Sequence, residues 1–196
     1  MKALEFVSTI KANNSVLDDL PPADKKYVYR VDSELIPNFE KNLKTYYHNK
    51  DFTLSGRKDF PESIGSIKGV YTHNLLFTAL YATGSSEGSD KKTRYVAKYA
   101  PGKPTVWFDK NDYENLKNNK AWLTVFDGSK FVKLPSGEYF SDNPGHPLKQ
   151  IRINDPFEYI RNRGWKIIMV NNLKAVLNNL KKLANNHKIK FGAEGM

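Results

Sequence analysis

The strongest candidate for chemistry in this sequence is a single arginine inside a predicted strand. Residues 27–33 read YVYRVDS, and their alternation places the two tyrosines on one face and Arg30 with Asp32 on the other. A buried guanidinium needs a partner, because an unpaired charge is costly to remove from water. Two interpretations are open. Arg30 lies at the surface, paired with Asp32 or Glu34, or it lines a cleft that binds an anion such as a pyrophosphate.

Other catalytic and metal chemistries find little support in the residue types. The chain has no cysteine, which excludes disulfides, thiolate catalysis and cysteine-ligated zinc. Its four histidines stand singly, without the spacing of a metal site, so we expect no metal. The sequence contains no P-loop, GxGxxG fingerprint or GxSxG nucleophile. Histidines near lysines and arginines leave acid–base cleavage of RNA open as an unspecific alternative.

Positive charge gathers near the end of the chain. The net charge is +10, and residues 146–196 hold ten basic and three acidic side chains, which gives this segment a charge of +7. Such asymmetry predicts either an acidic macromolecular partner, nucleic acid or a nucleic-acid-associated protein, or a solvated face that keeps the protein soluble. The candidate partner surface comprises Arg161, Arg163, Lys181, Lys182, Lys188 and Lys190.

The order of four segments points to a known family. YRVDS is followed by KGVYTHNLLFTALYA, then by TRYVAKYAPGKPTVWFDKND, and finally by HPLKQIRINDPFEYIRNRGWKIIMV. In this order the sequence resembles the mono-ADP-ribosyltransferase toxins of the cholera- and pertussis-like group, over roughly residues 27–170. That family binds NAD through a first-strand arginine, has a Ser-Thr-Ser motif just before a helix, and carries a catalytic glutamate on a later strand.

The resemblance implies roles for particular residues. Arg30 takes the place of the NAD-binding arginine, and Tyr71, Thr72 and His73 stand where the family has Ser-Thr-Ser, so that only Thr72 agrees. Counting back from the RGW stretch puts Gln150 at the position of the catalytic glutamate. In the family that glutamate stabilises the oxocarbenium-like ribose as nicotinamide leaves, and a neutral amide supplies no such charge.

Three interpretations of this departure are open. In the first, Glu138 in the stretch SGEYF supplies the carboxylate in place of Gln150. In the second, a variant triad uses His73 or Tyr71 to position NAD. In the third, the domain keeps the fold and has lost the chemistry. Thr72 and His73 also have a simpler role open to them, as caps of a following helix.

The predicted elements that must position these residues mix strands and helices. We expect strands at 27–32, 67–73, 93–100, 105–109, 148–153 and 165–170, with the strand at 93–100 central in its sheet. We expect helices at 1–20, 33–47 and 74–82, a helix or turn at 110–119, an amphipathic helix from 171 onward, and an exposed loop at 83–92. Residues 121–140 are typical of a meander, with turns at Asp127–Gly128 and Ser136–Gly137.

These features predict an α+β fold with an ADP-ribosyltransferase-like split sheet, a helical N-terminus and a basic C-terminal helix. Residues 1–196 are expected to form one domain, with the core at 27–170 and the basic helix and tail at 171–196. The favoured function is transfer of ADP-ribose from NAD, a substrate here, to a macromolecule. The alternative is a non-catalytic basic protein that binds nucleic acid or inhibits a host enzyme. Without a signal peptide or membrane span, we expect a cytoplasmic protein of bacterial-effector or bacteriophage type.

Overall fold

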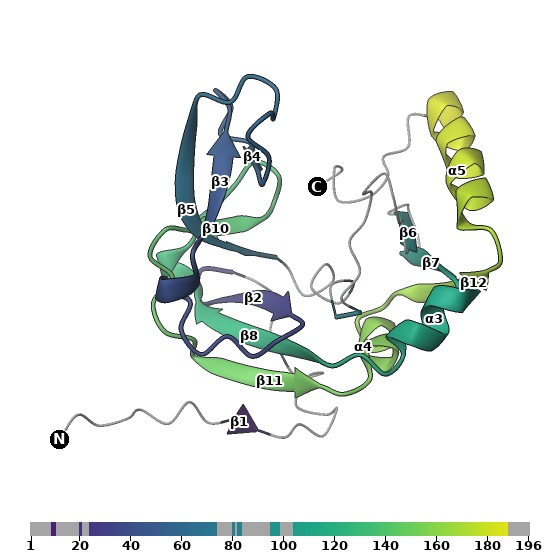
Figure 1. Ribbon diagram of the computed structural model, residues 1–196, viewed down its shortest axis with the longest axis horizontal. Coiled ribbons are helices and arrows are strands. Elements are labelled where there is room, and N and C mark those ends of the chain that lie inside the picture. Colours follow the sequence, from purple (N-terminus) through teal and green to yellow (C-terminus); the bar gives the residue numbers. More distant parts are fainter. Residues whose placement is uncertain are drawn as a thin grey trace.

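A four-stranded sheet lies in the middle of the molecule (Figure 1). The computed structural model describes residues 9–10, 20, 24–73, 80, 82–83, 95–98 and 104–187, and in these residues helices and strands are mixed in an α+β arrangement. The middle sheet has the order β1-β11-β8-β2. Its strands are β1 (Thr9–Ile10), β2 (Tyr27–Asp32), β8 (Ala121–Asp127) and β11 (Lys149–Ile153). β8 pairs antiparallel with β2 and β11, and β1 runs parallel to β11.

A five-stranded sheet of order β4-β3-β5-β10-β9 rises beside β2. Its strands are β3 (Lys44–His48), β4 (Leu54–Ser55), β5 (Gly65–Thr72), β9 (Val132–Lys133) and β10 (Tyr139–Ser141). Two short 3₁₀ helices, η1 (Glu40–Asn42) and η2 (Gly128–Lys130), lead into β3 and β9. A backbone bridge joins this sheet to the middle one: the N–H of His73, just past β5, donates to the carbonyl of Tyr29 at 2.8 Å.

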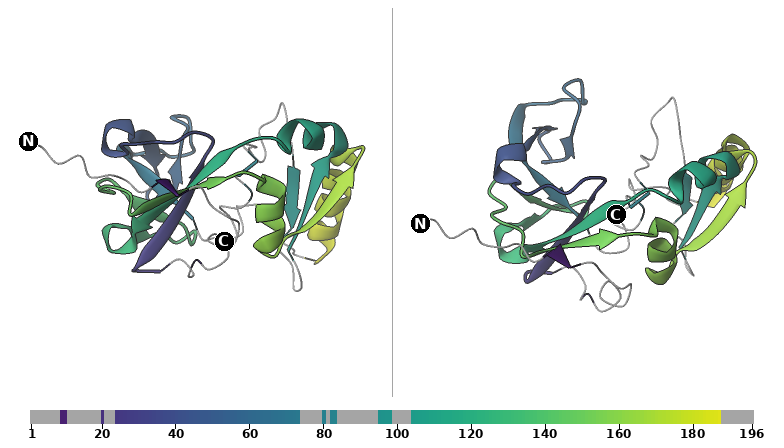
Figure 2. Two further views of the ribbon diagram at one scale, coloured as in Figure 1. Left: turned by 90° about the horizontal axis from the view of Figure 1, so that it is seen from below. Right: turned by 60° about the horizontal axis from the view of Figure 1, so that its bottom comes forward.

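The other end of the molecule combines a three-stranded sheet with helices (Figures 1 and 2). The sheet has the order β12-β7-β6 and contains β6 (Tyr95–Lys98), β7 (Thr105–Asp109) and β12 (Lys166–Val170). The helices of this end are α3 (Lys110–Leu116), α4 (Pro156–Asn162) and α5 (Leu173–His187). β8 begins at this end, just after α3, and β11 leads back to it and into α4, so these two strands link it to the middle sheet. Among the described residues, no helix is long and apolar enough to cross a membrane.

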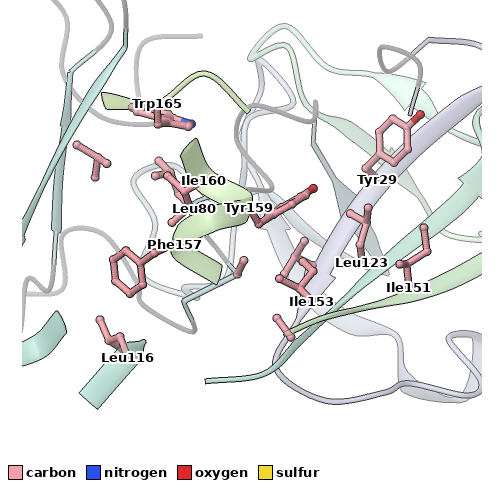
Figure 3. Packing of buried hydrophobic residues seen from close by; sticks show 14 of the residues in the cluster. Tyr29, Leu80, Leu116, Leu123, Ile151, Ile153, Phe157, Tyr159, Ile160 and Trp165 are labelled. Atoms are coloured by element: carbon pink, nitrogen blue, oxygen red, sulfur yellow. The ribbon is translucent and has the colours of Figure 1, made fainter. Parts of the chain in front are cut away.

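The main hydrophobic core lies where the middle sheet meets α4 and the three-stranded sheet (Figure 3). Successive side chains of a strand point to opposite faces, so one face of β2, β8 and β11 enters this core. Its large, fully buried side chains include those of Trp165, Tyr29, Phe108 and Phe157. Burying one such side chain contributes on the order of 2–3 kcal/mol. Burial, together with the charge of Asp24, also raises the pKa of Tyr29 to about 12.

The other face of β2 looks toward the five-stranded sheet. A second, smaller apolar cluster fills part of the space between the two sheets. Its buried members are Val28, Phe39, Val70, Phe126 and Phe131. The rings of Phe39 and Phe126 meet edge to face at 4.9 Å. Val28 and Arg30 share this face of β2, so the apolar cluster continues directly into the region around Arg30.

Most of the strands predicted from alternation are confirmed. β2, β7, β11 and β12 match the predicted ranges within one residue, and β5 begins two residues earlier than predicted. The predicted helices at 110–119 and from 171 onward are present as α3 and α5. The turn at Ser136–Gly137 is confirmed between β9 and β10, where Gly137 takes a φ of 89° that favours glycine.

The predicted helix at 33–47 is wrong. Residues 33–39 form no regular element, η1 is a single turn, and β3 occupies the end of the segment. The apolar residues spaced like a helix face do not share an environment, since Leu35 is 41% exposed whereas Phe39 is buried. The sequence KTYYH is rich in β-branched and aromatic residues, and β3 pairs with β5 over its whole length. Tertiary pairing therefore outweighs the helical spacing of this segment.

The predicted helical N-terminus is wrong where the chain is described. Thr9 and Ile10 form β1, which pairs with Gln150 and Ile151 of β11. The rest of the expected helix at 1–20, apart from Leu20, lies outside the described residues. So do most of the expected helix at 74–82 and of the loop at 83–92.

Two further expectations about strand connections are wrong. β6 lies at the edge of the described three-stranded sheet, not at its centre. Asp127 and Gly128 do not close a hairpin between β8 and β9, which belong to different sheets. The carboxylate of Asp127 accepts from the backbone N–H of Ser129 at 3.0 Å, which caps η2 and directs the chain from one sheet to the other.

Gly128 supplies a test of this crossover. A Cβ added there would collide with the backbone of Asp24 and would lie 2.9 Å from the carbonyl carbon of Lys25. Backbone atoms cannot rotate away as a side chain can, so we expect Gly128→Ala to lower the free energy of unfolding by about 1–3 kcal/mol. Urea denaturation followed by circular dichroism measures the change.

Gly56 provides the matched control, because a Cβ added there meets no atom within 4 Å. We expect Gly56→Ala to change the free energy of unfolding by less than about 1 kcal/mol. If Gly128→Ala and Gly56→Ala were equally stable, the backbone at Asp24 and Lys25 would not lie as close to Gly128 as the structure places it.

Candidate functional site

A cavity of about 520 Å³ lies between the end of β2 and the five-stranded sheet. This volume falls within the range of small-molecule sites, roughly 300–1,000 Å³. Its walls come from five separate segments of the chain. The lining residues are Arg30, Val31, Asp32, Ser33, Lys44, Tyr46, Leu54, Ser55, Gly56, Tyr71, His73 and Glu138. A strongly polar lining of this kind suits a ligand that carries both charge and rings.

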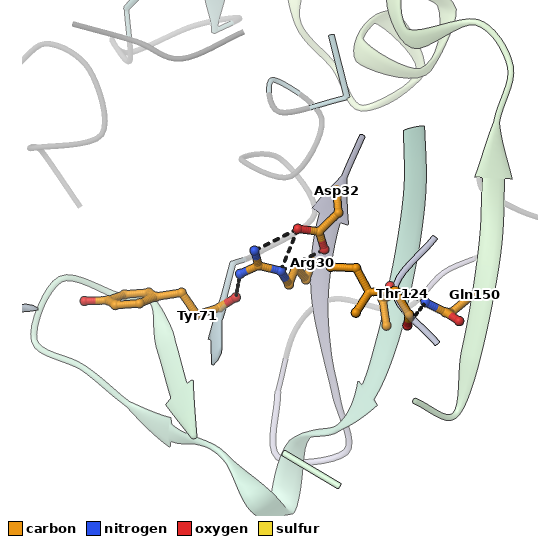
Figure 4. Close-up of polar contacts among 6 residues, drawn as sticks. Arg30, Asp32, Tyr71, Thr124 and Gln150 are labelled. Atoms are coloured by element: carbon orange, nitrogen blue, oxygen red, sulfur yellow. Dashed lines mark hydrogen bonds and ion pairs between the residues drawn. The ribbon is translucent and has the colours of Figure 1, made fainter. Parts of the chain in front are cut away.

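Arg30 is held by two neighbours in a fixed orientation (Figure 4). Its Nε donates to both carboxylate oxygens of Asp32, at 2.8 and 3.0 Å, and Nη2 donates to Oδ1 at 2.7 Å. Nη1 donates to the backbone carbonyl of Tyr71 at 2.9 Å. The side chains of Arg30 and Asp32 are 14% and 13% exposed. Arg30 is therefore paired with Asp32, as the first interpretation expects, but it lines a cavity and does not lie at the open surface.

The cavity keeps Arg30 charged and its tyrosines neutral. Burial by itself disfavours the guanidinium, but the hydrogen bonds and charge of Asp32, with a contribution from Tyr46, raise the pKa of Arg30 above its ordinary value. Burial raises the pKa of Tyr46, an effect that the nearby Arg30 partly offsets. Burial, with the charge of Glu138 adding to it, raises the pKa of Tyr71. At neutral pH the site thus presents a guanidinium beside two un-ionised phenols.

Glu138 brings a carboxylate to the same cavity. It lies just before β10, and its Oε2 accepts a hydrogen bond from the Ser136 hydroxyl at 3.0 Å. Its Oε1 lies 3.2 Å from Nδ1 of His73, and these two side chains are 23% and 13% exposed. The backbone bridge from His73 to Tyr29 holds the histidine at the end of β5. Glu138 and His73 therefore form a contact pair on the cavity wall.

Aromatic rings cover one side of the cavity. Tyr46 of β3 and Tyr71 of β5 meet at 5.0 Å between ring centroids, and each ring also contacts Phe140 edge to face. The ring of Tyr71 stacks on that of His73 at 6.2 Å, with 24° between the planes. Such a cluster offers flat apolar surface beside charged groups, which is the combination that a nucleotide requires.

Two residues predicted to act in the site do not line the cavity. Thr72 is fully buried on the opposite face of β5 from Tyr71, with its hydroxyl 3.5 Å from the carbonyl of Tyr139. Gln150 lies in the same row as Arg30, because β8 places Thr124 opposite both of them (Figure 4). Its amide is only 1% exposed and donates to the Ile36 carbonyl at 3.1 Å.

Gln150 thus has a packing role in this structure. The segment after β2 covers it, and its amide also donates to the hydroxyl of Thr124 at 3.2 Å. A buried amide satisfies these two acceptors, whereas a carboxylate has no hydrogen to donate to a carbonyl. The surroundings of the position that matches the family's glutamate therefore suit an amide and not a carboxylate.

Several cavity residues were not singled out in the sequence, and two of them bear directly on its chemistry. Lys44 and Tyr46 both lie on β3, in the segment for which a helix was predicted. The signal that was available is the alternation in KTYYH, which places these two side chains on one face of a strand. Lys44 is exposed at the cavity and adds a positive charge there.

The basic residues predicted as a partner surface fall in different environments. Arg161 on α4 and Lys182 on α5 are exposed. Arg163 is partly buried, with its guanidinium 5.2 Å from the centroid of the Tyr159 ring. The side chain of Lys181, together with residues 188 and 190, lies outside the described part of the structure. α5 packs its apolar face on Trp107 and Val170, and its Lys174 and Lys182 are exposed.

Known proteins offer no direct guide to the site. No protein-family model matches the chain, and neither the curated proteins nor the solved structures compared with it contain a match. Within the described residues, no group of three or more histidine, aspartate or glutamate side chains is arranged to hold a metal ion.

Substitution of Gln150 tests whether its buried surroundings require an amide. We expect Gln150→Glu to lower the free energy of unfolding by about 2 kcal/mol or more at pH 8, since a carboxylate there faces the Ile36 carbonyl in a dry site. Burial raises the pKa of the introduced carboxyl above its unfolded value of about 4.3, so the penalty grows as pH rises above that value. Urea denaturation at pH 5 and pH 8 measures both effects.

Gln150→Met is the uncharged comparison, and its loss of stability should be the same at both pH values. A Gln150→Glu variant as stable as the wild type at pH 8 would show that the amide is not required where the structure places it.

Proposed function

We propose that this cavity binds NAD and that the protein transfers ADP-ribose from NAD to a macromolecular acceptor. One observation carries the proposal: Arg30, Tyr71, His73 and Glu138, which come from three distant parts of the sequence, line a single cavity. Each of them is also a candidate site residue on sequence grounds. We also propose that the two sheets on either side of the cavity form the split sheet of an ADP-ribosyltransferase-like fold.

Arg30 and Lys44 are the groups proposed to hold the pyrophosphate. Three of the five N–H groups of Arg30 are directed at Asp32 and the Tyr71 carbonyl, which sets the plane of the guanidinium. The remaining donors serve the Tyr46 hydroxyl and a phosphate oxygen. Lys44 adds a second positive charge at the same cavity. Asp32 and Glu138 set two negative charges against the positive charges of Arg30 and Lys44, so a bound pyrophosphate adds negative charge to the cavity, and the nicotinamide cation of NAD offsets part of it.

Glu138 is the proposed catalytic carboxylate. When the bond between the ribose C1′ and the nicotinamide nitrogen breaks, its electron pair leaves with nicotinamide and the sugar develops positive charge. A fixed carboxylate beside that carbon stabilises the charge, as carboxylates do in glycoside hydrolysis. The Ser136 hydroxyl and the His73 ring hold Glu138 in place before the reaction begins. The tyrosine rings supply a stacking surface for nicotinamide or adenine.

The acceptor is proposed to be acidic, as nucleic acid or a nucleic-acid-associated protein. The exposed charges that support this are those of Arg161 and the lysines of α5 and β12. Positive charge on the surface raises the rate at which acidic partners arrive, and this effect weakens as salt is added.

Arg30→Ala is the decisive variant for this function. We expect it to reduce ADP-ribose transfer at least about 10²-fold, because a phosphate-positioning cation is lost from a site that excludes water. Glu138→Gln should cost a similar factor while leaving NAD binding nearly unchanged. The measurement is transfer of label from radiolabelled NAD to a bacterial lysate, with the products digested separately by protease and by nuclease to identify the acceptor.

Arg57→Ala is the matched control. Arg57 pairs with Asp59 at the same spacing as Arg30 with Asp32, but these side chains are 74% and 70% exposed and neither lines the cavity. We expect this variant to transfer label like the wild type. A folded wild-type protein that transfers no label would contradict the proposal. It would instead favour a non-catalytic nucleic-acid binder, whose affinity falls steeply with salt and with neutralisation of Lys181, Lys182, Lys188 and Lys190.

A further inference from the structure

We infer that His73 is the base that accepts the proton of the attacking group, and that this group is a hydroxyl, of an alcohol, a macromolecule or water. The inference rests on the proposed function and goes beyond it, because a carboxylate beside the ribose explains how nicotinamide leaves but not how the acceptor is activated. Three features of His73 carry it: its place on the cavity wall, its contact with Glu138, and the rigidity of its backbone.

The position of His73 is fixed from both sides. Its backbone N–H donates to the Tyr29 carbonyl at 2.8 Å, so the residue is tied to the strand that carries Arg30. Its ring stacks on Tyr71 and lines the same cavity as Arg30 and Glu138. A group held in this way loses little freedom when it acts, which is a requirement for an efficient proton acceptor.

The contact with Glu138 sets which nitrogen is basic. Nδ1 of His73 lies 3.2 Å from Oε1 of Glu138. A lone pair on Nδ1 would repel this carboxylate oxygen, so the hydrogen of the neutral ring belongs on Nδ1 and the lone pair on Nε2, although Nδ1 and Oε1 are not aligned for a hydrogen bond. The Ser136 hydroxyl occupies the other oxygen of Glu138 and keeps the carboxylate oriented. A carboxylate, a histidine and a hydroxyl-bearing reactant in this order form the arrangement that activates hydroxyl nucleophiles in hydrolytic enzymes.

The proposed step balances in atoms and charge. The bond between C1′ and the nicotinamide nitrogen breaks, and its electron pair makes nicotinamide neutral. The acceptor oxygen forms the new bond to C1′ and its proton passes to Nε2 of His73. Positive charge thus moves from the ribose to the imidazole, and Glu138 faces a cation throughout. The proton then leaves to solvent and restores the neutral ring.

The other charged and titratable groups of the cavity do not oppose the contact between Glu138 and His73. Arg30 and Asp32 of β2 neutralise one another, and Lys44 and Tyr46 of β3, with Tyr71 of β5, are cationic or neutral at pH 7. Glu138 is therefore the carboxylate of the cavity lining that lies against His73.

The test uses three acceptors that differ in whether they carry a proton. Purified protein is incubated with NAD in water, in dilute methanol and in azide, and ADP-ribose, methyl ADP-ribose and ADP-ribosyl azide are separated by chromatography. We expect His73→Gln to lower hydrolysis and methanolysis about 10²-fold or more. Azide carries no proton to remove. We therefore expect His73→Gln to form ADP-ribosyl azide at a rate within about tenfold of the wild-type rate.

His48→Gln is the control, because this histidine lies on β3 in the same sheet but does not line the cavity. Arg30→Ala should remain inactive with every acceptor. A His73→Gln variant with wild-type hydrolysis, or one that azide does not rescue although circular dichroism shows it folded, would overturn the role of His73 alone. A wild-type protein that consumes no NAD with any acceptor would overturn the proposed function and this inference with it.

Discussion

The structure around the cavity depends on one backbone hydrogen bond between two sheets. The N–H of His73 donates to the carbonyl of Tyr29, and through it the end of β5 is held beside β2. The same approach brings the Tyr71 carbonyl to Nη1 of Arg30 and places the His73 ring near Glu138. The hydrogen bond from Arg30 to the Tyr71 carbonyl and the small apolar cluster around Val28 join the same two sheets. The main-chain bridge and these contacts together bring groups from three distant segments to one cavity.

The electrostatics of the cavity follow from that geometry. Arg30 is tolerated in a half-buried position because Asp32, two residues along the same face of the strand, neutralises it with three short contacts. Arg57 and Asp59 repeat this spacing at the surface, where the pair faces water. The chemistry of the two pairs is the same, and only the sheet that covers the first pair gives it a cavity. Placement between the sheets is thus what turns an ordinary ion pair into a candidate binding site.

Part of the candidate site was predictable from the sequence. The alternation of YVYRVDS placed Arg30 on the face opposite the core, and the strand at the end of GSIKGVYT placed Tyr71 and His73 on one face. Lys44 and Tyr46 were not recognised as site residues, because the spacing of apolar residues at 35–47 resembles that of a helix. The pairing of β3 with β5 excludes that helix, and a local pattern does not report this pairing. Gln150 was predicted to lie near Arg30. Gln150 does lie in the same row across the sheet as Arg30, yet the segment at Ile36 covers Gln150. No local pattern reports which side chain a loop will cover.

The amino-acid sequence alone was enough to predict most strands with regular alternation, the amphipathic helix α5 and the charge of the C-terminal segment, whereas it left 110–119 open as a helix or a turn. These features arise from interactions between residues close in the chain, where the period of the apolar side chains is enough to identify the element. The tertiary structure decided which strands meet, that Glu138 rather than Gln150 reaches the cavity, and that His73 contacts a carboxylate. The contact between His73 and Glu138 joins residues more than sixty positions apart. Such contacts are set by how two sheets pack, and no pattern within one segment encodes that.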